Sequence, residues 1–269
     1  MTNEPQPTWS EENSETYAKV AQVAVPAREE QLAALLSLVP FGCDAEFKAV
    51  ELGSGEGFLS RALLTAYPNA AMTALDGSEL MRQRTAQRLA EFGQRAQVEP
   101  FDLFQTKWRS HLEGADVVVS SLVVHHLDGA GKQQLFRDVA DRTGPSGALL
   151  IADIVEAQRP EANAFFGATL DHFAAQQSRA IGGNDELYDL FRKEEWNIYL
   201  YPDPEFDKPS PLVHQLQWIA EAGFPVADCY WMQAGHAIYG GYKGLATIPE
   251  GRLSYADALA IAKTVLASG

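Results

Sequence analysis

A glycine-rich turn that carries two carboxylates is the segment of this chain best suited to chemistry. The run Glu51-Leu52-Gly53-Ser54-Gly55-Glu56-Gly57 follows a β-branched apolar stretch and opens a helical pattern. Glycines in such a turn let a ligand lie directly on backbone N–H groups, because no Cβ is in the way. A pyrophosphate would meet Glu51 and Glu56 there, and like charges repel. The turn therefore favours a nucleotide-like ligand that carries positive charge and no phosphate.

A third carboxylate follows at the end of the next expected strand. Asp76 ends the apolar run that begins at Ala71. In a βαβ unit, a carboxylate about 20 residues beyond the glycine turn accepts hydrogen bonds from ribose hydroxyls. The alternative is that Asp76 caps a helix or lies solvated in a loop.

The residues after Asp76 suit an adenine ring. Gly77, Ser78 and Met81 open the second helix and offer an apolar lip. Asp102 follows a third expected strand, 97–101, and its carboxylate can accept from an adenine amino group. A suitable group follows each of three successive strands. This regularity indicates one shared ligand site and not a coincidence.

Several segments resemble the class I S-adenosylmethionine-dependent methyltransferases. The similarity is greatest to the small-molecule and quinone-biosynthesis group, with the carboxy-S-adenosylmethionine enzymes of tRNA wobble-uridine modification as relatives. The resemblance covers about residues 45–155 well and is specific for fold and cofactor, not for substrate. It is carried by residues 51–57, 75–81, 115–121, His125-His126-Leu127 and 145–153.

The resemblance implies an α/β fold and S-adenosyl-L-methionine as cofactor. We expect a doubly wound, seven-stranded Rossmann-like sheet with an antiparallel last strand and a helical lid insertion. The expected cofactor contacts come from the turn, the strand ends and an N-terminal segment that folds over the cofactor in the family. They are Tyr17, Glu51, Gly53, Ser54, Gly55, Gly57, Asp76, Gly77, Ser78, Met81, Asp102, Leu103 and Ser121. Arg28 is a further candidate, or else the partner in a surface salt bridge.

The chain divides into six segments by pattern. The segment 156–210 is too long for an ordinary connection and rich in aromatic residues, so we interpret it as a substrate lid with Gly182-Gly183 as a hinge. The alternative is a helical extension that makes a satellite core or a dimer contact. The segments are a disordered tail 1–13, a helical cap 14–44 broken at Pro26, a cofactor core 45–155, the lid 156–210, the end of the sheet 211–244 and a tail helix 245–269.

Methyl transfer needs a base only when the acceptor is protonated. The candidate catalytic residues are His126, His125, His236 and Asp153, and the candidate substrate contacts are His172, Trp196 and Tyr199. For any single histidine, a structural role is the alternative. His236, Asp153 and His172 could together hold a metal, but this is weak evidence, and we assign no metal.

The composition argues against some classes of binding partner. The 269 residues carry a formal net charge of −15, with 21 Lys and Arg against 36 Asp and Glu, which disfavours nucleic acid. No apolar run of about 18 residues suggests a membrane span. The N-terminus does not resemble a signal peptide, and the two cysteines, Cys43 and Cys229, lack ligand spacing. A cytoplasmic location is therefore expected.

We therefore expect an enzyme that methylates oxygen or nitrogen of a small, partly apolar molecule. One alternative is a tRNA-modifying enzyme of the wobble-uridine type or a carboxy-S-adenosylmethionine enzyme. Another is a non-catalytic S-adenosylmethionine binder. The sequence is compatible with a monomer or a homodimer, because the tail helix would dock either on its own domain or on a partner subunit.

Overall fold

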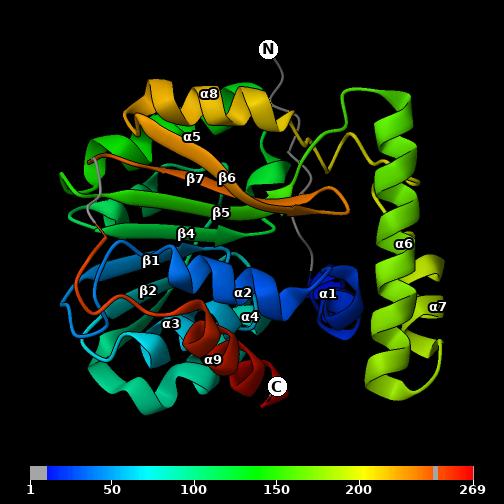
Figure 1. Ribbon diagram of the computed structural model, residues 1–269, viewed down its shortest axis with the longest axis horizontal. Coiled ribbons are helices and arrows are strands. Elements are labelled where there is room, and N and C mark those ends of the chain that lie inside the picture. Colours follow the sequence, from blue (N-terminus) through cyan, green and yellow to red (C-terminus); the bar gives the residue numbers. More distant parts are fainter. Residues whose placement is uncertain (1–10, 245–247, 269) are drawn as a thin grey trace.

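A seven-stranded sheet with the order β3-β2-β1-β4-β5-β7-β6 forms the centre of the protein (Figure 1). The computed structural model describes residues 11–244 and 248–268, without the side chains of residues 11–17. β1 to β5 are parallel, and β7 is antiparallel to both its neighbours, β5 and β6. The strands are β1 (Lys48–Leu52), β2 (Ala71–Asp76), β3 (Ala96–Pro100), β4 (Val117–Ser121), β5 (Ala148–Ile154), β6 (Val226–Gln233) and β7 (His236–Tyr242). The expected doubly wound sheet is confirmed.

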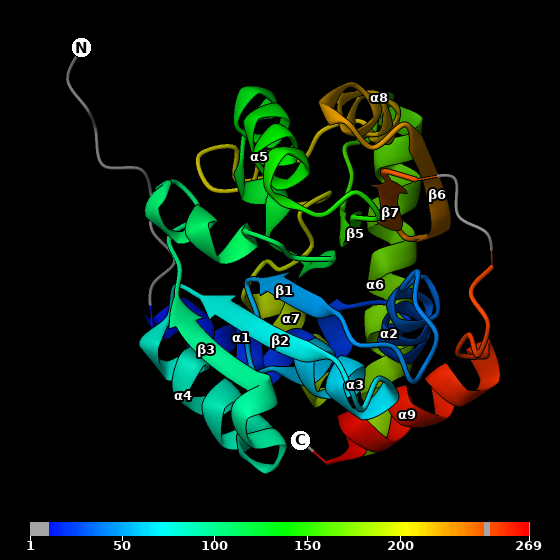
Figure 2. The same ribbon diagram turned by 90° about the vertical axis from the view of Figure 1, so that its left-hand side faces the viewer.

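Helices cover both faces of this sheet (Figure 2). One face carries α2 (Arg28–Ser37), α3 (Phe58–Ala66), α4 (Glu79–Leu89) and α9 (Tyr255–Ala267). The other carries α5 (Gly129–Arg142) and α8 (Leu212–Ala222). Three 3-10 helices connect these elements: η1 (Ala90–Arg95), η2 (Lys107–Leu112) and η3 (Val124–His126). β4 and β5 are almost wholly buried because helices shield both faces, as continuous apolar runs in a parallel sheet require.

A helical group lies beyond the carboxyl ends of the parallel strands. It consists of α1 (Glu11–Ala24), α6 (Pro160–Gly182) and α7 (Glu186–Lys193), with α6 standing beside the sheet in Figure 1. Val20 and Val23 of α1 pack against Leu170 of α6 and Phe191 of α7 in a separate apolar cluster. The insertion expected at 156–210 is therefore helical over much of its length.

The two ends of the chain differ from the expected boundaries. Residues 11–13, expected in a disordered tail, begin α1, while residues 1–10 lie outside the described part. α1 and α2 are separated around Pro26, as expected. At the other end, α9 packs against α2 and α3, so the tail helix docks on its own domain. Across residues 11–244 and 248–268, no helix has the length and apolar character needed to cross a membrane.

Candidate functional site

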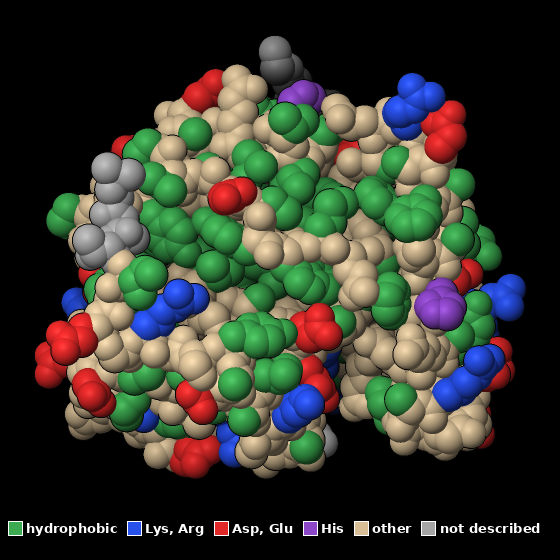
Figure 3. All heavy atoms as spheres, viewed as in Figure 1, with side chains coloured by type: hydrophobic (Ala, Val, Ile, Leu, Met, Phe, Trp, Pro, Cys, Tyr) green, Lys and Arg blue, Asp and Glu red, His purple; other side chains and the backbone are tan. Residues whose placement is uncertain are grey.

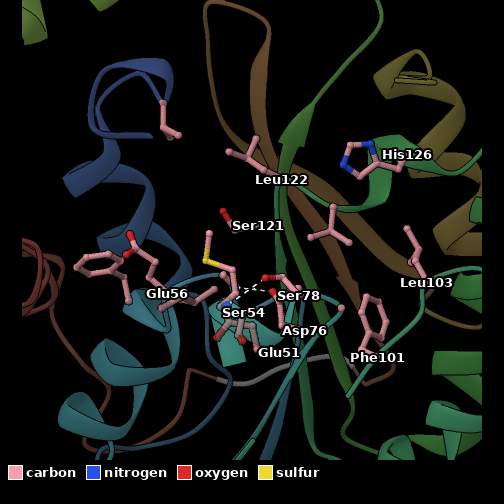
Figure 4. Close-up of a pocket in the computed structure, with 18 of the residues that line it drawn as sticks. Glu51, Ser54, Glu56, Asp76, Ser78, Phe101, Leu103, Ser121, Leu122 and His126 are labelled. Atoms are coloured by element: carbon pink, nitrogen blue, oxygen red, sulfur yellow. Dashed lines mark hydrogen bonds between the residues drawn. The ribbon is translucent and has the colours of Figure 1, made fainter. Parts of the chain in front are cut away.

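A cavity of about 360 Å³ opens where the parallel strands end. The ends of β1, β2 and β4 form its floor, and α2 closes one side. Figure 4 shows Glu51, Asp76 and Ser78 gathered at the base, with Glu56 and His126 on opposite sides. Ligands of open α/β sheets bind in this position, because the carboxyl ends of the strands leave a crevice there.

The glycine turn shapes one wall of this cavity. Gly53 and Gly55 have positive φ angles of 69° and 52°, which L side chains rarely adopt. A Cβ on Gly53 would lie 2.1 Å from Cγ2 of Val123, so this glycine permits close packing of two loops. A Cβ on Gly55 would meet no atom within 4 Å. Gly55 therefore keeps the floor of the cavity open for a ligand.

Asp76 ties the turn to the end of β2. Its carboxylate accepts a hydrogen bond from the backbone N–H of Gly55 at 2.7 Å and another from that of Ser78 at 2.9 Å. A carboxylate has about four acceptor positions, so both oxygens can accept further hydrogen bonds from a ribose. The carboxylate is thus held in place by the backbone before any ligand arrives.

The two glutamates of the turn have different environments. Glu51 is buried and accepts a hydrogen bond from the Ser60 hydroxyl, and burial raises its pKa to about 8. Glu56 instead forms an ion pair with Arg84 at 3.0 Å. The sequence argument counted Glu51 and Glu56 as two carboxylates that repel a pyrophosphate. In the structure Arg84 offsets the charge of Glu56, and burial favours neutral Glu51. Electrostatic exclusion of phosphate is weaker than the sequence suggested.

Most of the expected cofactor contacts line the cavity. Gly57 does not line it: this residue is the N-cap of α3, and a Cβ on it would lie 3.0 Å from Cγ2 of Thr85. The side chain of Tyr17 lies outside the described part. The expected residues that do line it are Glu51, Gly53, Ser54, Gly55, Asp76, Gly77, Ser78, Met81, Asp102, Leu103 and Ser121. Arg28 lines it as well.

The wall opposite the glycine turn joins two distant segments. His126 of η3 lies against Phe206, with the ring centroids 4.6 Å apart, and both side chains line the cavity together with Lys208. Phe206, Asp207 and Lys208 end the long insertion, and sequence analysis did not single them out. They lie in a proline-rich, irregular stretch that shows no helical or strand period, so no sequence signal was present.

A buried lysine fastens this insertion to η3. Lys132 donates hydrogen bonds to the carbonyl of Leu127 at 2.6 Å, to the carbonyl of Lys208 and to the hydroxyl of Ser210 at 3.0 Å. The side chain is 1% exposed, and burial lowers its pKa to about 8. The backbone N–H of Lys208 also donates to the carbonyl of His125 at 2.8 Å. These bonds place Asp207 beside the two histidines.

His125 is enclosed by two carboxylates. Its Nδ1 lies 2.5 Å from Asp153 and its Nε2 lies 3.4 Å from Asp207. Burial disfavours the imidazolium, but the two carboxylates outweigh burial and raise the pKa of His125 to about 9. The charge and hydrogen bonds of His125 in turn hold the pKa of Asp153 and of Asp207 low, against the effect of burial. A protonated, buried His125 is poorly suited to accept a proton.

His126 has the opposite protonation preference. Burial, followed by the charge of His125, lowers its pKa below the ordinary value, so its imidazole is neutral at pH 7. Its Nδ1 lies 3.2 Å from Asp207 and 3.3 Å from the carbonyl oxygen of Phe206, two acceptors that favour a proton on Nδ1. That tautomer has its lone pair on Nε2. The pair of histidines thus separates into a cation and a neutral, basic group.

His125, His126 and Asp207 could bind a metal ion only if the two histidines lost protons. Ligand atoms of His125, His126 and Asp207 lie within 4.8 Å of one another, and no other such group of three occurs among the described residues. Both histidines would have to lose the protons that now face Asp207. The sequence instead suggested His236, Asp153 and His172. His236 and Asp153 do approach each other where β5 pairs with β7, but His172 is exposed on α6 and does not join them.

The remaining candidates lie away from the cavity. His236 is buried, and burial lowers its pKa to about 4. The Tyr199 hydroxyl donates to the carbonyls of Val155 and Gly235 at 2.8 Å each, which anchors the insertion to the sheet. Trp196 packs in the cluster between α1, α6 and α7. The structure therefore brings only His126, among the residues expected in catalysis or substrate binding, to the cavity wall.

Comparison with known proteins identifies the central part of the chain. Residues 50–149 match a family described as "Methyltransferase domain". A mitomycin biosynthesis 6-O-methyltransferase from Streptomyces lavendulae is 31% identical over 122 residues. These residues are 44% of this chain and 33% of that relative, so the match spans about a third of the relative's length.

Solved structures share the fold at low sequence identity. An O-methyltransferase family protein from Burkholderia thailandensis superposes with a TM-score of 0.60 and 15% identity, over 87% of this chain and 60% of that one. An O-methyltransferase family 2 protein from Planctomyces limnophilus, solved in complex with apigenin, has a TM-score of 0.55 and 16% identity, over 85% and 60%. At these identities the comparison supports the fold alone.

Proposed function

We propose that residues 50–149, which match a methyltransferase domain, are of the class I, S-adenosylmethionine-dependent kind, and that this chain methylates a hydroxyl oxygen of a small, partly apolar molecule. The observation that carries the proposal is one cavity with a fixed ribose acceptor, Asp76, on one wall and a neutral histidine, His126, on the other. The names of the relatives favour oxygen over nitrogen as the acceptor atom.

The cofactor supplies a methyl group already activated by its sulfonium, so the chain has to bind, orient and exclude water. The backbone at Gly55 and the carboxylate of Asp76 hold the adenosine end. Nε2 of His126 accepts the proton of the acceptor hydroxyl while that oxygen bonds to the methyl carbon and the carbon–sulfur bond breaks. The products are the methyl ether, S-adenosylhomocysteine and a protonated His126.

The acceptor side of the cavity suits a molecule with an apolar body. Leu122, Val123 and Phe206 line it near His126. Lys208, on the same wall, would stabilise a phenolate through its positive charge. We therefore propose a phenol or a similarly acidic hydroxyl as the acceptor group.

The test is a coupled assay for S-adenosylhomocysteine with a panel of phenols, alkyl alcohols and amines. Methylation of phenols, with tight cofactor binding measured separately by calorimetry, would support the proposal. Tight cofactor binding without turnover of any acceptor would favour the non-catalytic binder. Preferential turnover of amines would overturn the assignment of oxygen.

The lid role of α6 and α7 stays a proposal. Its support is their position beyond the strand ends and the direct continuity of the insertion with Phe206. Ligand-induced protection of 160–193 from hydrogen exchange would be expected of a lid. Unchanged exchange in the presence of cofactor and acceptor would favour a satellite core.

A homodimer and a cytoplasmic location are also proposed. Phe165 and Ile181 of α6 are 63% and 52% exposed, and apolar side chains of this size are covered in many dimers. The molar mass from light scattering at micromolar concentration would show whether the chain is a monomer or a dimer. Cys43 and Cys229 are free thiols, as a reducing compartment favours, and fractionation of the source cells would decide the location.

A further inference from the structure

A second cavity, of about 370 Å³, adjoins the cofactor cavity, and four of its eight lining residues are cations. The two cavities share Arg28, Glu56 and Phe58. This concentration of positive charge is unexpected in a chain with a formal net charge of −15. The lining residues are Ala18, Lys19, Gln22, Arg28, Glu56, Phe58, Arg84 and Arg88.

Four separate elements deliver the charges to this cavity. Lys19 comes from α1, and Arg28 is the first residue of α2. Arg84 and Arg88 lie one turn apart on α4, and Glu56 lies in the glycine turn. The amino end of α2 adds the positive end of a helix dipole at Arg28. A cationic cavity assembled from four elements differs from a charged stripe on one solvated helix.

Among the described residues, only one carboxylate pairs with these four cations. Glu56 pairs with Arg84 at 3.0 Å, and its backbone carbonyl accepts from Nε of Arg88 at 2.7 Å. Lys19, Arg28 and Arg88 form no ion pair with the carboxylates of the part described. Three of the four cations are therefore without a carboxylate partner in that part of the chain.

Two of these cations are held close together by an aromatic ring. The guanidinium carbons of Arg28 and Arg88 lie 4.6 Å and 3.7 Å from the centroid of Phe58. Burial lowers the pKa of Arg88, and the charges of Arg61 and Arg28 lower it further, against Glu56. The cation–π contacts hold both guanidinium groups beside one ring, and guanidinium N–H groups are well suited to bind an anion.

The cofactor can supply only part of the negative charge that this cavity would attract. S-adenosylmethionine carries a single carboxylate, on its amino-acid end. If that carboxylate met Arg28, which lines both cavities, Lys19 and Arg88 would still have no carboxylate partner among the described residues.

We propose that this cavity binds the phosphate or carboxylate group of a second small molecule beside the cofactor. Planar guanidinium groups bind either anion through paired hydrogen bonds, and Lys19 adds a point charge. A nucleic-acid backbone is less suited, because cations and carboxylates are interspersed over the face shown in Figure 3 and no basic track leads across it. This inference goes beyond methyl transfer, since anion binding can be measured without turnover.

Calorimetry with inorganic phosphate and pyrophosphate on the full chain tests the proposal at constant ionic strength. Both should bind, pyrophosphate more tightly, and saturating S-adenosylhomocysteine should change neither affinity by more than about threefold. Arg88→Gln and, separately, Lys19→Gln should each weaken pyrophosphate binding, by about tenfold for the arginine. Arg137→Gln, an exposed arginine on α5, is the matched control and should bind as wild type. Lys19 is exposed, so its variant tests the proposal even if Arg88→Gln misfolds.

Three results would overturn the proposal. The first is no pyrophosphate binding at millimolar concentration, and the second is equal binding by both variants and wild type. The third is loss of binding when S-adenosylhomocysteine is present, which would show that the cations serve the carboxylate of the cofactor. A single-stranded RNA oligomer could instead bind over a hundredfold more tightly than pyrophosphate and lose affinity in Arg88→Gln. That result would identify the ligand of this cavity as a nucleic acid and not a small anion.

The methyl-transfer assay distinguishes two sources of the anion. Phosphate that competes with the acceptor would mean that the acceptor itself bears the acidic group. Phosphate that changes kcat without competing would mean that a separate molecule binds there. Either result supports the anion site, and failure of methyl transfer would leave the calorimetric result standing.

Discussion

The two walls of the cofactor cavity are built in different ways. The glycine wall consists of residues close in sequence, from Glu51 to Met81, and hydrogen bonds from backbone N–H groups to the carboxylate of Asp76 hold it. The histidine wall joins His126 to Phe206, 80 residues further along the chain. It is supported by ionisable groups: Lys132 and Asp153, which are buried, and Asp207, which is partly exposed. A local motif thus prepares the cofactor site, while long-range charge pairing prepares the acceptor site.

This difference has a consequence for pH. In the glycine wall, burial raises the pKa of Glu51 to about 8, so Glu51 should stay neutral below that pH and ionise as the pH rises through it. The histidine wall depends on the protonation of His125 and His126, whose pKa values are moved in opposite directions. Variants in one wall should therefore alter cofactor binding, and variants in the other should alter turnover or stability with pH.

The largest expected effect is in the glycine wall, for Gly55→Val. The valine side chain would fill the space above the turn, and its backbone would have to adopt a positive φ. The affinity for S-adenosylhomocysteine should therefore fall by more than about a thousandfold. Calorimetry measures the affinity. Gly114→Val is the control, since Gly114 also has a positive φ and open space but lies far from the cavity. Tight binding by Gly55→Val would show that no ligand lies on the turn.

In the histidine wall, His126→Asn should lower kcat by about 10²- to 10⁴-fold and leave cofactor affinity within about twofold. The pH profile gives a second readout. The lowered pKa of His126 means that wild-type activity is constant near pH 7 and falls as pH drops through that pKa, below about 6.5. An acid limb that persists unchanged in the variant would assign the titration to another group.

The ion pairs of His125 should contribute to the free energy of unfolding. His125→Asn leaves buried Asp153 and partly exposed Asp207 without their cation, which should lower the free energy of unfolding by about 3 kcal/mol. Because the folded pKa of His125 is raised to about 9, this stabilisation is complete below about pH 6.5 and is lost as pH rises through 9. Denaturant melts of wild type and variant at pH 6 and pH 9.5 measure it. A difference that does not shrink at pH 9.5 would contradict the ion-pair explanation.

The smallest expected effect is for Asp76→Ala in the glycine wall. Loss of a charge-assisted hydrogen bond to the ribose should weaken cofactor binding by about 1.5–3 kcal/mol. Asp102→Ala offers a comparison, because its carboxylate binds the backbone N–H of Phe104 at 3.0 Å and is expected to face the adenine. Unchanged affinity in Asp76→Ala would mean that this carboxylate only holds the turn together.

Most of the cofactor side could be predicted from sequence for a physical reason. Glycines at a strand-to-helix turn and Asp76 at the next strand end occupy positions that the parallel sheet places side by side. Strand period and turn chemistry are local properties, so they can be read without knowing the tertiary structure. The expectation about Glu56 failed because its partner, Arg84, lies 28 residues away on another element.

The acceptor side could not be predicted in the same way. His172, Trp196 and Tyr199 were chosen because aromatic residues in a long insertion suggested a lid. The structure places Tyr199 against the carbonyls of Val155 and Gly235 instead, and brings the irregular end of the insertion to the cavity. Aromatic content does not reveal which residues face a ligand and which fill a core.

By itself the sequence determined the order of strands and helices, the open glycine turn and the presence of a carboxylate beside it, since each follows from local spacing. Only the tertiary structure decided which of two adjacent histidines is charged and which faces the cavity. That choice depends on Asp153, Asp207 and Lys132, three ionisable groups from separate parts of the chain, of which Asp153 and Lys132 are buried. Burial and charge pairing act through space, and the protonation of a side chain becomes defined only when its neighbours are in place.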